Sequence, residues 1–185
     1  MKDVFLVLAG AVTIGSVVPY IRNIIKGTTK PNIVSWITWT MLTGVATIAE
    51  IAAGEYRTAI FTGTAVIETL LIVLLGIKYG HTKYTAFDVV CQAGALFGFV
   101  LWAIFNSPAA AVIFAVTIDL VGALPTIRHS WLKPGEETWI TYGMAGLGGL
   151  LAIFALTEFN WTSLTYAVYV VFINCLLSII LVTRI

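Results

Sequence analysis

Long apolar runs separated by short polar segments make up almost the whole chain. Seven runs are each about 20 residues long, the length an α-helix needs to cross a membrane. They cover roughly residues 4–25, 33–54, 58–78, 86–105, 109–128, 138–157 and 163–183. The runs are continuous rather than alternating, which argues against the strands of a membrane barrel. Because a backbone in lipid must satisfy its own hydrogen bonds, we expect seven transmembrane helices in an all-α integral membrane protein.

The composition supports this interpretation. Hydrophobic residues make up 59% of the chain and charged residues 10%, whereas an average soluble domain carries about 25% charged residues. The first run follows Lys2, but it is too long for a signal peptide, and no cleavage site with a mature soluble domain follows it. No soluble domain of useful size remains, which makes a soluble enzyme improbable.

Basic residues predict the orientation. Seven helices place eight basic residues on one side: Arg22, Lys26, Lys30, Lys78, Lys83, Arg128, Lys133 and Arg184. Only Lys2 and Arg57 fall on the other side. The positive-inside rule then puts the N-terminus outside and the C-terminus in the cytoplasm. With short loops and no sorting signal, we expect the plasma (inner) membrane and a lipid bilayer as surroundings, and no nucleic-acid partner.

The chain also repeats itself. Three segments recur at a nearly constant offset: Pro19-Tyr20-Ile21-Arg22 as Pro125-Thr126-Ile127-Arg128 (offset 106), Trp36–Met41 as Trp139–Met144 (offset 103), and Glu68–Leu71 as Asn174–Leu177 (offset 106). Internal repeats in a hydrophobic protein indicate a symmetric transporter whose substrate site lies between the repeats.

The repeats predict the domain organisation. Residues 1–80 form repeat one with helices 1–3, residues 81–106 hold the unpaired helix 4, and residues 107–185 form repeat two with helices 5–7. The single extra crossing makes the two three-helix bundles parallel, related by an axis along the membrane normal. Since one chain holds both repeats, it could form a complete pathway. Assembly into a homo-oligomer stays open.

Two carboxyl groups fall near the middle of predicted membrane helices, Glu68 and Asp119. A carboxylate at that depth costs about 2.5–3.5 kcal/mol, and such residues mark ion pathways, proton relays or sites for cations. The alternative is a neutral, hydrogen-bonded structural acid. Asn174 occupies the position of Glu68 in repeat two, and Thr13 occupies the position of Asp119 in repeat one. We expect these four residues to contact the solute; for Asn174 the alternative is a helix–helix hydrogen bond.

Prolines and aromatic residues near the cytoplasmic side could control access. Pro19 and Pro125 each remove a backbone hydrogen bond near the end of a helix, which predicts either a hinge or a static kink. Four aromatic residues lie one turn into the second helix of each repeat: Trp36, Trp39, Trp139 and Tyr142. They form either an interfacial aromatic belt or an inner gate beneath the cavity.

Metal and enzyme chemistry find little support. Cys91 and Cys175 fall inside predicted helices, where we expect them to be small buried apolar residues, and no CxxC or Cys/His cluster indicates a metal. His81 and His129 fall in predicted loops. No Ser/His/Asp grouping appears. We therefore expect no cofactor, no metal site and no enzymatic activity.

These features resemble the SWEET and PQ-loop transporter superfamily, over almost the whole chain. The family has a three-plus-one-plus-three arrangement in which the fourth helix is an inversion linker. Its namesake Pro-Gln dipeptide is here Pro19-Tyr20 and Pro125-Thr126, and Ser35 and Thr138 match its spacing. The family carries a substrate-contacting asparagine in the third helix of each repeat, at the positions of Glu68 and Asn174. No tryptophan stands where its sugar carriers place one late in helices 2 and 6, near Ala49–Glu50 and Ala152.

The resemblance implies alternating access for a small polar solute, such as a sugar or an amino acid, between two rocking bundles. Glu68 and Asp119 tilt this mechanism toward proton coupling or a cationic substrate. The alternatives are a vitamin-precursor facilitator of similar architecture and a non-transporting receptor or assembly factor on the same scaffold.

Overall fold

The computed structural model describes residues 1–52, 54, 56–105, 107–156 and 159–184. Within these ranges it leaves out the side chains of residues 57, 58, 61, 108 and 162. Asn106, where the predicted linker segment ends, lies outside the described residues, as does the side chain of Arg57.

The described part of the chain forms seven α-helices and one short 3₁₀ helix. They are α1 (Lys2–Ile25), α2 (Ile33–Ala52), α3 (Tyr56–Tyr79), α4 (Ala86–Ile104), α5 (Pro108–Leu132), η1 (Pro134–Glu136), α6 (Trp139–Ala155) and α7 (Trp161–Arg184). These helices match the seven predicted runs to within about four residues at each end, as is usual for element boundaries. No strand occurs among the described residues.

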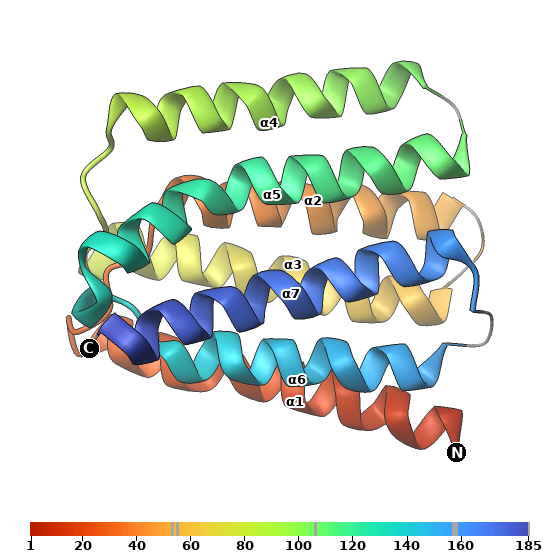
Figure 1. The fold of residues 1–185 in the computed structure, drawn as a ribbon, viewed down its shortest axis with the longest axis horizontal. Coiled ribbons are helices and arrows are strands. Elements are labelled where there is room, and N and C mark those ends of the chain that lie inside the picture. Colours follow the sequence, from red (N-terminus) through yellow and green to blue (C-terminus); the bar gives the residue numbers. More distant parts are fainter. Residues whose placement is uncertain (53, 55, 106, 157–158, 185) are drawn as a thin grey trace.

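Six of these helices are long and apolar enough to cross a membrane, and α6, with 17 residues, is a shorter apolar helix. The fold is therefore that of an all-α membrane protein, as the hydrophobic runs predict. Figure 1 shows the helices side by side along the long axis of the molecule, with the N- and C-termini at opposite ends. Much of the apolar surface is exposed, including Val7, Ile67, Val90 and Phe172, as expected of helices that face lipid.

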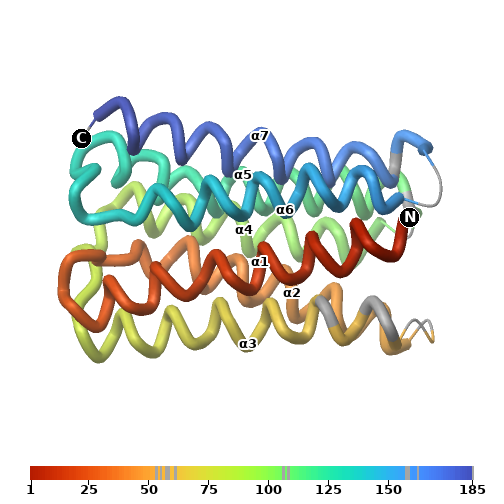
Figure 2. Tube along the Cα trace, turned by 90° about the horizontal axis from the view of Figure 1, so that it is seen from below, coloured from red at the N-terminus to blue at the C-terminus, as the bar shows by residue number. Residues whose placement is uncertain are grey.

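The helices pack in the same order in both halves of the chain. α3 packs against α1 and α2, whereas α1 and α2 approach each other less closely among the described residues, through the side chains of Tyr20 and Trp36. In the same way α7 packs against α5 and α6. Figure 2 shows α1, α2 and α3 in one half of the molecule and α5, α6 and α7 in the other. This shared order is what a duplicated three-helix unit would produce.

Two interfaces join the halves, and they are unequal. α1 packs closely along α6, whereas the equivalent pair, α2 and α5, makes a much sparser interface. Gly148 permits the close approach, because a Cβ atom there would lie 3.3 Å from the carbonyl oxygen of Ala9 and closer still to the Thr13 hydroxyl. α4 packs on α5 and, more weakly, on α2, and so lies beside the sparser interface.

The two ends of the molecule differ in charge. The end that holds the C-terminus also carries Arg22, Lys78 and Arg184 in the last turns of their helices, and the connections after α1, α3 and α5. We call it the basic end, and the other the opposite end. Gly27 and Gly80 adopt positive φ angles of 72° and 132° at the basic end, where α1 and α3 finish. Glycine adopts such angles without the steric cost of a Cβ atom.

Replacing Gly122 by alanine should loosen the contact between α5 and α2. A Cβ atom at Gly122 would lie 2.5 Å from Cγ2 of Thr38, a residue that is fully buried. Such overpacking costs about 1–3 kcal/mol. We expect Gly122→Ala to lower the melting temperature of the purified protein, measured by tryptophan fluorescence. Gly44→Ala is the matched control, since nothing lies within 4 Å of a Cβ atom there. Equal melting temperatures for both variants would contradict this packing.

Candidate functional site

A cavity of about 550 Å³ lies in the half of the molecule toward the opposite end. It is partly open and is lined by α2, α3, α4, α5 and α7, so it occupies the sparser of the two interfaces. Along α2 it extends from Glu50, near the end of that helix, to Leu42, near its middle. The cavity therefore lies between the opposite end and the middle of the bundle.

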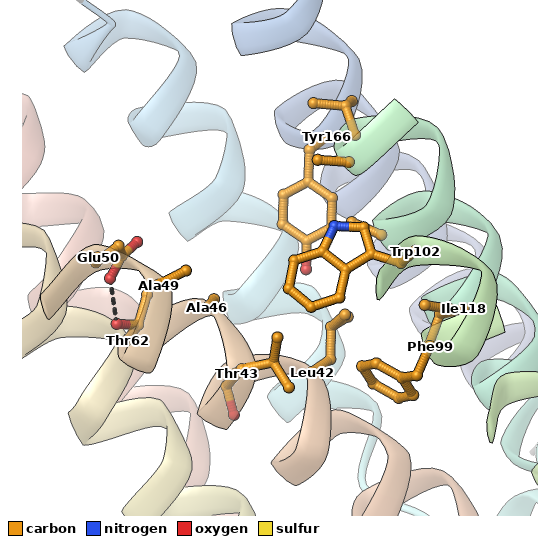
Figure 3. A pocket seen from close by; sticks show the side chains of 14 residues that line it. Leu42, Thr43, Ala46, Ala49, Glu50, Thr62, Phe99, Trp102, Ile118 and Tyr166 are labelled. Atoms are coloured by element: carbon orange, nitrogen blue, oxygen red, sulfur yellow. Dashed lines mark hydrogen bonds between the residues drawn. The ribbon is translucent and has the colours of Figure 1, made fainter. Parts of the chain in front are cut away.

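The wall of this cavity is mostly apolar. It includes Leu42, Val45, Ala46, Phe99, Trp102 and Ile118. Its polar side chains are few: Thr43, Glu50, Thr62, Tyr166 and, through its indole N–H, Trp102. Figure 3 shows Glu50 on one side of the cavity, hydrogen-bonded to Thr62, with Trp102 and Tyr166 on the other side. The Thr62 hydroxyl donates to Glu50 Oε2 at 2.6 Å.

Asp119 lies directly behind Tyr166 in a cluster of aromatic hydrogen-bond donors. Its carboxylate accepts hydrogen bonds from Trp39 Nε1 (2.9 Å), the Tyr169 hydroxyl (3.1 Å) and the Tyr166 hydroxyl (3.2 Å). These four residues form what we call the Asp119 cluster, and they join α2, α5 and α7. Asp119 is buried, with 7% of its surface exposed. Tyr166 belongs to both the cavity wall and the cluster, so its side chain connects the cavity to the carboxylate.

A second cluster closes the bundle toward the basic end. Glu137 Oε2 accepts hydrogen bonds from the hydroxyls of Tyr20 (2.8 Å) and Tyr142 (3.1 Å), and Trp36 Nε1 donates to Tyr20 at 3.2 Å. All four residues are buried. We call them the closure cluster. Trp36 meets Trp39 edge to face with ring centroids 4.8 Å apart, so aromatic packing runs without a break from the closure cluster to the Asp119 cluster.

The closure cluster ties the two halves of the chain together. Tyr20 comes from α1, while Glu137 and Tyr142 come from the segment that enters α6. Next to it, two residues from the end of α1 and its following loop bond to the loop after α5: Thr29 to Thr138 between hydroxyl oxygens at 2.6 Å, and Asn23 Nδ2 to the Thr138 hydroxyl at 3.0 Å. These contacts hold the end of α1 and the start of α6 together at the basic end.

Two adjacent acids at the basic end have opposite pKa shifts. Burial raises the pKa of Glu137 to about 8, and its hydrogen bonds from Tyr20 and Tyr142 only partly offset this effect. Burial also acts to raise the pKa of Glu136, but the hydrogen bond from Lys30 (2.9 Å) and the positive charge of Lys133 outweigh it, so the net pKa is lowered. Oε1 of Glu137 has no hydrogen-bond partner among the described residues. Paired acids with diverging pKa values are typical of functional sites.

The predicted pair Glu68 and Asn174 does not line the cavity. Glu68 is half-buried on α3 and makes no hydrogen bond or ion pair with a described residue. Asn174 is half-buried on α7, donates to the carbonyl oxygen of Val170 at 2.9 Å, and lies beside Gly146 of α6. No hydrogen bond joins the two among the described residues. Their role in binding a solute stays a prediction.

Thr13 and the two prolines lie away from the cavity as well. Thr13 packs on Gly148 at the α1–α6 interface, on the other side of the bundle from Asp119 and the cavity. α1 and α5 remain helical through Pro19 and Pro125, and Pro125 is fully buried. A hinge at these positions also stays a prediction.

The four predicted gate residues have different environments. Trp36 and Tyr142 are in the closure cluster, and Trp39 is in the Asp119 cluster. Trp139 is 44% exposed and takes no part in either cluster. Three of the four are therefore hydrogen-bonded inside the bundle, an arrangement that an aromatic belt would not require.

Sequence reasoning missed Glu137, Tyr166 and Tyr169 as site residues, and used Tyr20 only as part of a repeated motif. One signal pointed to Glu137: the repeat alignment pairs it with Val34, so an acid stands where the other copy has an apolar residue. Tyr166 and Tyr169 offered the i, i+3 spacing that places two side chains on one face of a helix.

The described residues hold no group of three or more metal-binding side chains. No family model, no curated protein and no solved structure matches this chain. What the site does must therefore be argued from its own geometry.

Proposed function

We propose that this protein is a membrane transporter that moves a small solute by alternating access between two three-helix bundles, α1–α3 and α5–α7. One observation carries the proposal. A partly open cavity large enough for a small molecule lies toward one end of the bundle, and two layers of hydrogen-bonded side chains lie between it and the other end. We infer a solute site that is accessible from the first end and sealed from the second, as alternating access requires at one stage of its cycle.

The packing order supports the same proposal. The middle helix of each half is the third in its sequence, α3 and α7, and the two halves meet through equivalent helix pairs, α1–α6 and α2–α5. This arrangement fits parallel repeats related by an axis along the membrane normal, as in SWEET-like transporters. In this proposal all seven helices cross the membrane, the basic end faces the cytoplasm, and the cavity opens outside.

Proton coupling is part of the proposal because buried acids occur along this path. Asp119 lies next to the cavity, and Glu137 lies in the seal beyond it. A pKa of about 8 suits Glu137 to change its charge near physiological pH. Glu68 stays a candidate proton carrier on the strength of its depth in the membrane.

The direct test is solute uptake into proteoliposomes, with and without an inward proton gradient, using radiolabelled sugars, amino acids, amines and vitamin precursors. We expect uptake of one class that increases with the gradient. Uptake that ignores the gradient would indicate a facilitator, and would overturn the proton-coupled part. Absence of flux for every class, with folded protein, would overturn the transporter proposal in favour of a receptor or assembly factor.

Filling the cavity should stop transport. Ala46 lines the cavity on α2, and a tryptophan there would occupy much of its volume. We expect Ala46→Trp to lower uptake at least tenfold without lowering the melting temperature. Ala93→Trp is the matched control, because Ala93 is exposed on α4 and does not line the cavity. Uptake that survives Ala46→Trp would show that the solute passes elsewhere.

A further inference from the structure

We propose that the solute is an organic cation with an apolar body, and that the Asp119 cluster binds its charged group. This inference rests on the proposed transport function, because it names the substrate class of the same cavity. It selects a cation over the sugar or amino acid that the family resemblance implies, and over the proton coupling that the buried acids also suggest.

The cavity wall offers a polyhydroxylated solute few hydrogen-bond partners. A sugar carries several hydroxyl groups, and each one buried without a partner weakens binding. The Thr43 hydroxyl is already bonded to the Trp39 carbonyl oxygen at 2.8 Å and the Thr62 hydroxyl to Glu50, which leaves mainly the Glu50 carboxylate and the Trp102 indole N–H. The Tyr166 hydroxyl donates to Asp119. An aliphatic or aromatic body, by contrast, would pack against Leu42, Phe99 and Trp102.

The described charged side chains in and beside the cavity wall are negative. The described residues that line it include an acid, Glu50, and no lysine, arginine or histidine. Asp119 does not line the cavity but accepts a hydrogen bond from Tyr166, which does. No described basic residue forms an ion pair with Asp119. A cleft lined by charge of one sign raises the local concentration of the oppositely charged solute. The cavity therefore favours cations over neutral molecules and anions.

The donors around Asp119 are neutral, and this suits a cationic ligand. Trp39, Tyr166 and Tyr169 direct their N–H and O–H groups at the carboxylate but carry no charge, which leaves its negative charge uncompensated. A cation that displaced the Tyr166 hydroxyl would pair with the carboxylate and leave its apolar body in the cavity.

A structural role for Asp119 makes a different prediction, which the choice of variant can separate. If Asp119 only joined α2, α5 and α7 by hydrogen bonds, asparagine would substitute for it with little effect on ligand preference, since its amide oxygen accepts hydrogen bonds. If Asp119 binds a cation, asparagine removes the attraction. Asp3→Asn is the matched control, because it removes the same charge at an exposed position in the first turn of α1.

The test uses three probes with one apolar body and different charges: 3-phenylpropylammonium, 3-phenylpropanol and 3-phenylpropionate. Their Kd values would be measured by calorimetry on the full-length protein in detergent, beside those of the two variants. We expect the cation to bind the wild type and Asp3→Asn at least tenfold more tightly than the alcohol, and the anion to bind most weakly. In Asp119→Asn the cation and the alcohol should bind within about twofold of each other.

Equal binding of cation and alcohol to the wild type would overturn the proposal, as would a cation preference that persists in Asp119→Asn. Failure of the transport proposal looks different. Selective cation binding without flux in proteoliposomes would retain the ligand class and reject transport. Flux of a sugar that Ala46→Trp blocks would retain transport and reject the ligand class.

Discussion

A Glu137→Gln variant should lose the fall in thermal stability that the wild-type protein shows as the pH rises from about 4.5 to about 8. The pKa of Glu137 is raised from 4.5 to about 8 by burial in the closure cluster. The folded protein therefore holds a proton that the unfolded chain releases in this range, and stability declines as the pH rises through it. A shift of this size corresponds to a loss on the order of 5 kcal/mol.

Melting temperatures at pH 6 and pH 9.5, measured in detergent by tryptophan fluorescence, would test this result. Glutamine stays neutral at both values and can still accept hydrogen bonds from Tyr20 and Tyr142, so its melting temperature should change little. Glu136→Gln is the control. The pKa of Glu136 is lowered, so its contribution is lost only as the pH falls below that range, and this variant should keep the wild-type difference. An unchanged pH dependence in Glu137→Gln would show that Glu137 is not the group responsible.

Asp119→Leu should destabilise the protein more than any other single change in the Asp119 cluster. Leucine removes the acceptor from three donors, on Trp39, Tyr166 and Tyr169. Each buried donor left without a partner costs about 1–3 kcal/mol, so we expect a total loss of several kcal/mol. Asp119→Asn should lose much less, because the amide oxygen keeps part of the bonding.

A second set of variants separates lost hydrogen bonds from a poorly fitting side chain. Adding Tyr166→Phe and Tyr169→Phe to Asp119→Leu removes two of the stranded hydroxyls, and the combined variant should recover part of the stability. The melting temperature and the fraction of monodisperse protein in detergent are the measurements. Strictly additive losses across the series would indicate that these hydrogen bonds contribute nothing to stability.

The sequence predicted the helices well because each one is set locally. A run of about 20 apolar residues between polar turns has few other solutions in lipid. α3 illustrates this point: residues 58–78 were expected, and Tyr56–Tyr79 is observed. The apolar run predicts that α5 ends at residue 128, but it continues to Leu132, and the polar residues His129 and Ser130 of its last turn are buried.

The candidate site was only partly accessible to sequence reasoning. Asp119 stood out because an acid in an apolar run needs partners, but the identity of those partners depends on how α2, α5 and α7 pack. The sequence does not mark Glu137 as a site residue, because it follows a proline, a glycine and another acid, a pattern typical of an exposed loop. Burial of that loop against α1 is a tertiary effect, and the 0% exposure of Tyr20 is its result.

The unequal contacts between the two halves restrict how they can move. α1 and α6 lie in close contact through Gly148, whereas α2 and α5 enclose the cavity. Relative motion of the halves would therefore be a rotation about the α1–α6 interface, which stays in place, with the widest displacement at α2 and α5. α4 lies along that free edge, packed on α5 and on the basic-end half of α2 through the Thr38–Gln92 hydrogen bond. Any separation of α2 and α5 must therefore either bend α4 or break its contacts with one of these helices. α4 thus restrains the motion of the two halves as well as connecting them in the chain.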